Sequence, residues 1–570
     1  MPDWRIWLMR KQRLWMLPVM ILAVLVLFGC ATASAAGPDV WVSVDGSLRA
    51  DAIMISANSG SGYSLFLPAN LDTDGSLCFG VADNVSFSVK GKQIHTGDSA
   101  AFLKPGSSYS IKINKKSSTL KVYSGSEGLP AVYITTESGK LNKVEASKNN
   151  RESGWLILRA ADGTVQCDSE LEHIKIRGNS SVQFAKKNYQ IKLTKGADLL
   201  GMGKAKKWIL TGNYRDKSNL RNMIMMDLAA AIGVPYTPQH TFAELYINHE
   251  YRGLYLFSEK VEIDGDRINI NDLEKDTEKL NEKALSKYKF VGKKKSTKGS
   301  WKAYQIENNP EDITGGYLLE YEKYPTRYAD EASAYTTKKG AVIVIKSPEY
   351  VSVEQMKYIS SLVQSFENAI TNENGTDPDT GKHYTEIADL ESLALKYMIE
   401  EISENYDGNS SSQYFFKPED EISEKLFAGP VWDYDSTFGS YAQQYNAKKV
   451  LNPEYLWIAS GGDHYAWYPS LYRQADFRDY VGKIWNDRVC AAVENLLGIR
   501  SDNTQLRSID EYAGMIEKSV EMDRIRWPRQ KNASTVAQTG YSFKENVRYL
   551  KDYLKKRYEF LNKTWIASQP

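Results

Sequence analysis

The sequence predicts an α+β protein in which a small all-β domain precedes a larger mixed domain. Three observations support this fold class. Short segments between residues 38 and 125 alternate apolar and polar side chains, the region from about residue 130 mixes such segments with helical patterns, and the chain from about residue 465 is mostly helical in pattern. The length of 570 residues also exceeds what one compact core usually accommodates.

The first 36 residues resemble a secretory leader. Basic residues precede an apolar run over residues 14–28, which ends at Leu27-Phe28-Gly29-Cys30, a sequence with the form of a bacterial lipobox. We therefore expect an exported chain that is lipidated at Cys30 and anchored to the outer face of the bacterial cell membrane. Ordinary cleavage near the small residues 33–35, which gives a secreted protein, and an uncleaved anchor helix are the alternatives.

The composition excludes several classes of protein. The formal net charge of +1 gives no electrostatic basis for a nucleic-acid partner. Beyond Cys30, only Cys78, Cys167 and Cys490 remain, far apart and odd in number, so no disulfide framework is expected. Neither the cysteines nor the six histidines have zinc-ligand spacing, and a zinc enzyme is not expected.

Residues 38–125 are expected to form a small immunoglobulin-like β-sandwich. Stretches of alternating polarity occur at residues 40–44, 85–89 and 109–113, and Gly, Asn, Asp and Ser separate them. The expected role of this domain is a spacer or a binding module. Residues 124–128 are the expected linker to the next domain.

The larger domain is expected to span residues 126–566 and to begin with strands at residues 173–178 and 189–193. Ser218 is the expected cap of a helix that stops at Gly233. A hairpin should follow, with strands at residues 242–248 and 254–257.

A segment from about residue 262 to 385 looks inserted. It contains Lys293-Lys294-Lys295-Ser296-Thr297-Lys298, for which a solvated loop is the simplest interpretation and a contact with phosphate or an acidic protein the alternative. After this segment, a helix over residues 389–404 leads to a strand at 413–417 and a second strand at 426–431.

Two acidic segments follow the helix and the second strand of this unit. Asp407 comes after the helix, and Asp433 and Asp435 lie within Trp432-Asp433-Tyr434-Asp435. Folding of the unit can bring the carboxylates together, where they repel one another unless a cation or a proton lies between them. Mg²⁺ takes carboxylate oxygens and leaves positions for phosphate, so the pattern favours a magnesium site for phosphate-linked chemistry. Aspartates that cap turns are the structural alternative.

Basic side chains upstream supply the charge that a polyphosphate requires. Lys192 lies between two apolar neighbours on a predicted strand, from which it can project into a cleft. Arg177 and Lys187 precede it, and a polar Gly-Asn-Ser-Ser turn follows Arg177. A solvent-facing strand lysine is the alternative interpretation of Lys192.

In their order along the chain, these segments resemble the spore-coat protein H (CotH) kinase family, an atypical branch of the protein-kinase-like fold. The resemblance implies a two-lobed catalytic domain that uses ATP and Mg²⁺. It covers about residues 130–565 and is carried by residues 176–181, 187–193, 216–222, 251–259, 405–408 and 429–435.

The resemblance also implies roles for single residues. Lys192 corresponds to the strand lysine that contacts the ATP phosphates, with Arg177 and Lys187 beside it. Glu259 lies on the strand that borders the adenine. Asp407 is the implied catalytic aspartate, which orients or deprotonates the acceptor.

The implied metal ligands are Asp433 and, as a second contact, Asp435. A protein kinase also has an asparagine after its catalytic aspartate, which holds a second metal ion. Here the corresponding stretch is Ser410-Ser411-Ser412-Gln413, so Gln413 is the candidate that remains.

We therefore expect an exported, ATP- and Mg²⁺-dependent transferase that modifies secreted or cell-surface proteins, most simply by phosphorylating serine or threonine. The same site chemistry serves adenylyl transfer and glutamylation, so the transferred group stays open. A surface adhesion or scaffold protein with a degenerate kinase-like domain is the alternative from another class. Hydrolysis of a polysaccharide by paired carboxylates is a third interpretation.

Overall fold

The computed structural model combines helices and sheets, with 30% of the chain helical and 28% in strands, which confirms the predicted α+β composition. The expected leader and Cys30 lie outside the described residues. In the part of the chain that is described, no helix is long and apolar enough to cross a membrane. The structure describes residues 37–58, 62–71, 76–440, 451–461, 467–503, 505–528 and 542–566.

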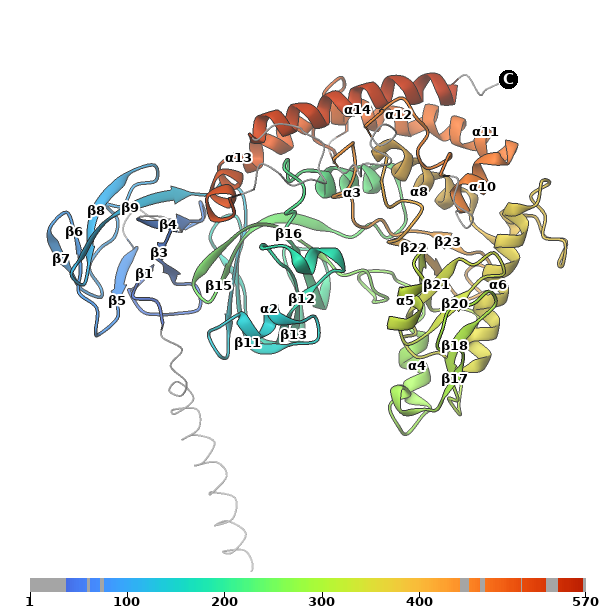
Figure 1. Cartoon of the computed structure of the whole chain (residues 1–570), viewed down its shortest axis with the longest axis horizontal. Helices are drawn as coiled ribbons and strands as arrows, with labels where there is room; N and C mark the ends of the chain where they lie inside the picture. Colours follow the sequence, from blue (N-terminus) through green and yellow to red (C-terminus); the bar gives the residue numbers. More distant parts are fainter. Residues whose placement is uncertain are drawn as a thin grey trace, which may run out of the picture.

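Residues 40–124 form two β-sheets that pack around a common apolar core (Figure 1). One sheet has the strand order β2-β1-β5 and the other the order β3-β4-β9-β8-β6-β7. Every second side chain of β8 (Ser108–Ile113) is buried, as the alternating polarity of its sequence predicts. The other strands are β1 (Val40–Ser43), β2 (Ile53–Met54), β3 (Ser56–Ala57), β4 (Tyr63–Leu67), β5 (Cys78–Val81), β6 (Phe87–Val89), β7 (Lys92–Ile94) and β9 (Lys116–Ser124).

The core of these two sheets continues into the larger domain. Phe66 stacks on Tyr251 with 4.9 Å between the ring centroids, and the hydroxyl of Tyr246 donates to the carbonyl of Phe66 at 3.1 Å. The expected linker is therefore not a free connection, because Ser126 is buried and β9 extends as far as Ser124. The N-terminal sheets are packed on the larger domain rather than tethered to it.

The next seven strands close into a barrel in the order β10-β11-β12-β13-β14-β16-β15. Along β13 (Asn188–Asp198), Tyr189, Ile191 and Leu193 fill the barrel interior, and Lys192 between them lies on the outer face. Parallel pairing of β10 with β15 completes the closure. The remaining strands are β10 (Ala131–Thr136), β11 (Glu152–Arg159), β12 (Val165–Arg177), β14 (Lys204–Thr211), β15 (His240–Ile247) and β16 (Glu250–Glu259).

The strands expected at residues 173–178 and 189–193 and the hairpin that follows Gly233 are all present in the barrel. The hairpin turns at Asn248 and His249, whose φ angles are 51° and 71°. Two consecutive positive φ values define the two-residue turn that best matches the twist of paired strands. The turn is therefore shorter than the sequence pattern suggested.

Helix α3 (Arg221–Ile232) begins two residues later than a cap at Ser218 predicts. Asp216 caps it instead, because its carboxylate accepts the backbone amide of Arg221 at 2.8 Å and the hydroxyl of Ser218 at 2.6 Å. A carboxylate is also favoured near the positive end of a helix. The helix ends as expected at Gly233, which has a φ of 88°.

The segment that looked inserted is integrated into a seven-stranded sheet of order β17-β18-β20-β21-β19-β22-β23. Its strand β19 (Tyr317–Glu322) pairs with β22 (Gln413–Lys417), so the segment borders the loop that contains Asp407. The other strands are β17 (Phe290–Gly292), β18 (Trp301–Tyr304), β20 (Ala334–Thr336), β21 (Val342–Ser347) and β23 (Phe427–Ala428). The helices of this region are α4 (Leu273–Lys279), α5 (Pro325–Asp330), α6 (Val353–Thr371) and α7 (Tyr384–Ile387).

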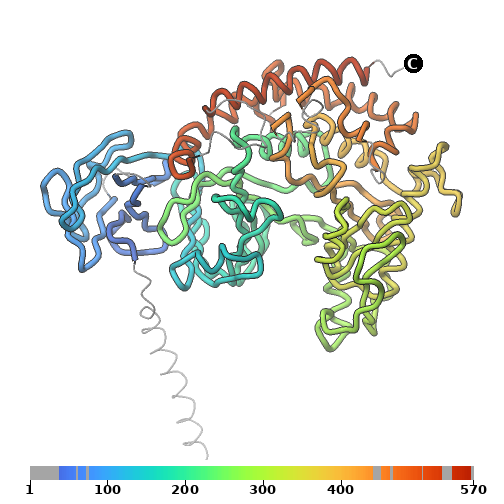
Figure 2. The backbone as a smooth tube through the Cα atoms, viewed as in Figure 1, coloured from blue at the N-terminus to red at the C-terminus, as the bar shows by residue number. Residues whose placement is uncertain are grey.

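The C-terminal part is helical from Trp467, close to the expected residue 465. Helix α13 (Ile509–Arg526) extends from the helical part to the barrel and the N-terminal sheets, where it contacts β16 and β9 (Figure 2). The other helices are α2 (Asn142–Ala146), α8 (Leu390–Ser403), α10 (Trp467–Arg473), α11 (Ala475–Ile484), α12 (Cys490–Leu497) and α14 (Phe543–Ile566).

A buried ion pair fastens α13 to the barrel. The ammonium of Lys186 lies 2.6 Å from Asp523, and neither side chain is accessible to solvent. Lys186 also donates to the carbonyl of Leu254 at 2.6 Å, and Asp523 accepts the backbone amide of the same residue at 3.1 Å. Because both charges are desolvated, each requires the other.

Lys186→Met is expected to lower the free energy of unfolding by about 3–5 kcal/mol, because the buried Asp523 then loses the cation that compensates its charge. Lys192→Met is the control, since it removes a solvent-exposed pair with Glu172 and should cost about 1 kcal/mol or less. Urea unfolding followed by tryptophan fluorescence measures both losses. Equal losses would show that the buried pair contributes no more than a surface pair.

Glu244 on β15 gives the stability a specific pH dependence. Burial raises its pKa from 4.5 to about 7, and its carboxylate accepts the hydroxyl of Tyr251 at 2.6 Å. Between these two pH values the folded protein retains a proton that the unfolded chain has released, so stability falls as the pH rises through this window.

Glu244→Gln is expected to reduce the fall in Tm between about pH 5 and about pH 8, because the amide cannot titrate. Thermal unfolding at the two pH values, compared between the variant and the wild type, measures the effect. Glu127→Gln, at an exposed position, is the control and should behave like the wild type. An identical fall in the wild type and Glu244→Gln would contradict the raised pKa.

Candidate active site

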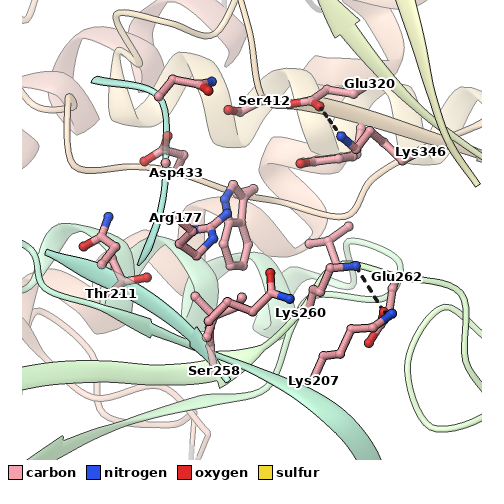
Figure 3. Close-up of a pocket in the computed structure, with 18 of the residues that line it drawn as sticks. Arg177, Lys207, Thr211, Ser258, Lys260, Glu262, Glu320, Lys346, Ser412 and Asp433 are labelled. Carbon is pink, nitrogen blue, oxygen red and sulfur yellow. Dashed lines mark hydrogen bonds and ion pairs between the residues drawn. The ribbon is translucent and has the colours of Figure 1, made fainter. Parts of the chain in front are cut away.

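A cleft of about 1090 Å³ lies between the outer face of the barrel, the seven-stranded sheet and the two acidic segments (Figure 3). Basic side chains reach it mainly from the barrel side, and carboxylates reach it from the sheet and the acidic segments. Charged residues that line the cleft include Lys175, Arg177, Lys207, Arg215, Lys260, Glu262, Glu320, Asp407, Asp433 and Asp435.

Asp407 lies in the loop after α8, and hydrogen bonds within the loop fix its backbone. The helix ends at Glu404, whose φ of 47° reverses the chain direction. The side-chain oxygen of Asn405 accepts a hydrogen bond of 3.1 Å from the backbone amide of Asp407. The side-chain amide of Asn405 donates to the carboxylate of Glu400 at 2.6 Å. The Asp407 side chain therefore lines the cleft from an ordered loop.

The segment Trp432-Asp433-Tyr434-Asp435 presents both aspartates to the cleft because Tyr434 points away from it. Tyr434 is fully buried, and its hydroxyl donates to Glu400 at 2.7 Å. Its backbone amide donates to the side chain of Asn222 on α3, also at 2.7 Å. Asp433 has a φ of 68°, which is uncommon for a residue other than glycine and often marks a functional site.

The first residue of α3 and the loop before it hold the acidic segment from the barrel side. Arg221 is buried, pairs with Asp216 at 2.5 Å and donates to the carbonyl of Thr437 at 2.9 Å. The stretch 216–222, which carries part of the family resemblance, therefore has a structural role. It sets the position of the acidic segment relative to the barrel.

The pKa values of all three aspartates are raised. Burial and the charge of Asp435 raise the pKa of Asp407 to about 6. Asp433 is exposed to the solvent of the cleft, but desolvation by the cleft walls and the charges of Asp435 and Asp407 raise its pKa to about 7. Burial also raises the pKa of Asp435, and a hydrogen bond of 3.0 Å from Ser436 opposes that shift.

This donor set fits a hard divalent cation, which would remove the repulsion between the carboxylates. Among the described residues, no three His, Cys, Asp or Glu side chains are placed to ligate a single ion. That arrangement agrees with Mg²⁺, which is usually held by one or two carboxylates together with substrate phosphates. Asp433 and Asp435 are the two carboxylates of the acidic segment that face the cleft.

Arg177, the last residue of β12, lies in the cleft as the sequence predicts. Its guanidinium is 5.1 Å from the centre of the Trp432 ring, and the charges of Asp433 and Glu320 act on it. Figure 3 shows Arg177 between Asp433 and Lys260. Its planar donors are therefore available to an anionic group that binds beside the aspartates.

Lys192 and Lys187, both expected at the phosphates, do not line the cleft. Lys192 forms an ion pair of 2.8 Å with a glutamate of β12 on the outer face of the barrel. Lys187 donates to the carbonyl of Val182 at 2.7 Å and so stabilises the 3₁₀ turn η1 (Ser180–Gln183). Lys192 lies on the outer face of the barrel, which is the face that borders the cleft. Of the β13 residues on this face, only Asn188 and Gln190, nearer the start of the strand, reach the cleft.

Glu259 and Gln413 are also turned away from the cleft. Glu259 is buried at the end of β16 and pairs with Arg267 at 3.1 Å, while its neighbours on either side face the cleft. Gln413 is buried too, and its amide oxygen accepts the ammonium of Lys396 at 2.7 Å. That oxygen is engaged by the Lys396 ammonium, and Gln413 does not line the cleft in this structure.

Several basic residues that the sequence patterns did not single out line the cleft instead. Lys207 and Lys260 share the carboxylate of Glu262, at 2.8 and 3.1 Å. Lys175 forms no ion pair with another described residue, and burial and nearby cations lower its pKa. A signal for Lys175 exists in the sequence, because it lies between two isoleucines on a strand just as Lys192 lies between apolar residues.

A known protein family matches most of the chain. Residues 174–561, more than half of the chain, match the family described as CotH kinase protein. The chain therefore belongs to the CotH kinase protein family, which confirms the resemblance found in the sequence and indicates a kinase-like transferase. No protein with a curated function matches the sequence.

Asp435→Asn is expected to lower the pKa values of both Asp407 and Asp433, because it removes a negative charge that acts on each. Carbon NMR shifts of labelled aspartate carboxyls, followed against pH, measure the change, and single Asp→Asn variants assign the signals. Asp168→Asn, at an exposed position on β12, is the control. Unchanged pKa values in Asp435→Asn would show that the charge of Asp435 does not raise them.

Proposed function

We propose that the chain is an exported, ATP- and Mg²⁺-dependent transferase that phosphorylates serine or threonine residues of secreted or cell-surface proteins. The observation that carries this proposal is that Asp407, Asp433, Asp435 and Arg177 line the same cleft. Family membership supplies the kinase-like class. Phosphoryl transfer requires little covalent chemistry from the protein, so catalysis consists of positioning and charge stabilisation, which these residues can provide.

The arrangement of the chain around the cleft supports the expected two-lobed, kinase-like catalytic domain. Barrel residues line one side of the cleft and residues of the seven-stranded sheet line the other. Figure 1 shows the barrel and this sheet as separate parts of the chain. In this interpretation the barrel is the smaller lobe, and α3 connects it to the α8 side of the larger lobe.

Asp433 and Asp435 would hold the magnesium ion. When bound, Mg²⁺ offsets the charge of the phosphates and of the developing transition state. The buried Tyr434 between the two aspartates sets their direction before any ligand arrives. Carboxylates fixed in this way cost little reorganisation when the ligand binds.

The cations of the barrel wall would bind the phosphates. Arg177 is stacked on Trp432 and offers planar donors that suit phosphate oxygens. Lys175 has no carboxylate partner among the described residues, and it lies close enough to Lys207 for that charge to lower its pKa. The phosphates would thus replace water around a group of partly desolvated cations.

Asp407 would orient the acceptor hydroxyl and accept its proton. A pKa of about 6, compared with 3.8 for an unperturbed aspartate, leaves the group ionised at neutral pH and makes it a stronger base. The hydrogen bond from its backbone to Asn405 keeps it in place.

Export and lipid anchoring at Cys30 are part of the proposal and rest on the leader pattern of residues 1–36. They would place the cleft outside the cell. Secreted and surface proteins are therefore the proposed partners, and no nucleic acid is required.

The purified chain is expected to bind ATP more tightly with Mg²⁺ than without it, and Asp433→Asn is expected to lose that increment, because a carboxylate ligand is gone. Isothermal titration calorimetry with and without Mg²⁺ measures both affinities. Asp168→Asn again serves as the matched control, since it removes an exposed aspartate of the barrel. Equal binding by the wild type and Asp433→Asn would remove the metal site from the proposal.

Asp407→Asn is expected to retain ATP binding but to transfer at a rate lower by about a hundredfold or more, because the acceptor loses its general base. Intact-mass analysis of candidate acceptor proteins identifies the group, and phosphate adds about 80 Da. A larger increase would indicate adenylyl transfer or glutamylation. No mass change on any acceptor, together with no ATP turnover, would favour a scaffold protein.

A further inference from the structure

A basic hairpin at one edge of the seven-stranded sheet has no part in the proposed transfer. Residues 283–298 contain no Asp, Glu or Arg, and their lysines give this short segment a charge far above the +1 of the whole chain. We name these exposed residues the lysine hairpin: Lys283, Lys287, Lys289, Lys293, Lys294, Lys295 and Lys298.

The charge of the lysine hairpin is not neutralised by its surroundings. Within the described ranges, Lys283 alone of these lysines forms an ion pair, at 3.5 Å with the exposed Glu307. Lys293 makes a long hydrogen bond of 3.5 Å to the hydroxyl of Thr297. The cations are therefore available to an external anion, and their mutual repulsion would fall when one binds.

Residues 293–298 form the exposed loop that the sequence predicts as the simplest case, and hydrogen bonds hold its backbone in place. Thr297 donates its amide to the hydroxyl of Ser300 at 2.9 Å, and Ser300 returns its amide to the carbonyl of Thr297 at 2.8 Å. The hydroxyls of Ser296 and Thr336 lie 3.0 Å apart and connect the turn to β20. A preformed array of cations loses less entropy when it binds a partner than a disordered loop does.

The composition of the lysine hairpin selects among anionic partners. It has no arginine to recognise phosphates through two parallel donors, which disfavours nucleic acid as the partner. It also lacks an exposed aromatic or large apolar side chain that could stack on a base or enter a bilayer, because Tyr288 is buried and Phe290 is half-buried. Carboxylates, which pair with lysine as point charges, are the partners that remain.

The lysine hairpin also lies on the lobe that borders the cleft. Helix α4 lines the cleft through Glu274 and Glu278, and the chain continues from α4 directly into the hairpin. β17 is the edge strand of its sheet, and Figure 1 shows α4 and β17 together at the end of this lobe, away from the C-terminal helices. A protein whose acceptor residue occupies the cleft would therefore have neighbouring parts of its surface near the hairpin.

We propose that the lysine hairpin binds an acidic segment of the protein substrate, outside the residues that enter the cleft. The identity of this partner as the substrate rests on the proposed transferase function, whereas the binding itself does not. The hairpin would raise the affinity for acidic proteins without contacting the reacting groups.

Fluorescence anisotropy with the purified full chain and a labelled peptide of about ten glutamates tests the binding without ATP. Binding is expected and should weaken as the salt concentration rises. The variant Lys293→Gln/Lys294→Gln/Lys295→Gln is expected to bind about tenfold more weakly or worse. The control Lys112→Gln/Lys115→Gln/Lys116→Gln changes three exposed lysines of the hairpin between β8 and β9 and should stay within about twofold of the wild type.

Three outcomes would overturn the proposal: no binding by the wild type, equal losses in the two triple variants, or a loss of binding to phosphatidylserine vesicles with peptide binding unchanged. A transfer assay with one acceptor protein, made with and without a glutamate tail, links the surface to catalysis. The 293–295 variant should raise KM for the tailed acceptor alone and leave kcat unchanged. If the wild type transfers nothing but the variant still loses peptide binding, the transferase function fails and the acidic-segment site stands.

Discussion

The geometry of the cleft depends on one buried carboxylate, that of Glu400 near the end of α8. It pairs with Lys396 one turn earlier, accepts the hydroxyl of Tyr434 at 2.7 Å and accepts the side-chain amide of Asn405 at 2.6 Å. These donors come from three places: the helix, the loop of Asp407 and the acidic segment. A carboxylate removed from water must keep all its donors, so the three segments are fixed relative to one another.

The neighbouring residue extends this arrangement to the end of the chain. Glu401 pairs with the fully buried Arg557 of α14 at 2.5 Å and accepts the backbone amide of Ala459 at 2.9 Å. On the barrel side, Arg221 and the pair of Lys186 with Asp523 make equivalent connections. The cleft thus lies between elements joined by desolvated ionic contacts, which suits a site that works by preorganised charge.

Local sequence patterns were sufficient to predict the strands and helices, and also to predict that the three aspartates lie near one another. The strands around residues 176 and 191 alternate apolar and polar side chains, and helix α8 has an apolar run that is long enough for a buried helix, so both patterns can be recognised in the sequence alone. Asp407 could be grouped with Asp433 and Asp435 because only two short strands and a turn separate the two acidic segments.

The same patterns could not predict which side chains enter the cleft, because that depends on the tertiary structure. Lys175 and Lys192 have the same local environment in the sequence, and only their places along paired strands put one in the cleft and the other outside it. Gln413 was assigned by analogy with a kinase asparagine, but a helix that comes earlier in the chain supplies Lys396 as its partner. Such contacts join distant segments, and no window of sequence contains them.

The closed barrel has a consequence for how this catalytic unit can be divided. The match to the family starts at residue 174, inside β12, whereas β10 and β11 lie before it and β10 closes the barrel against β15. A fragment cut at that boundary would leave β15 with an unpaired edge and open the apolar interior to water. The unit of folding is therefore longer than the unit of family similarity, and any gene rearrangement that moves the catalytic part intact must carry the upstream strands with it.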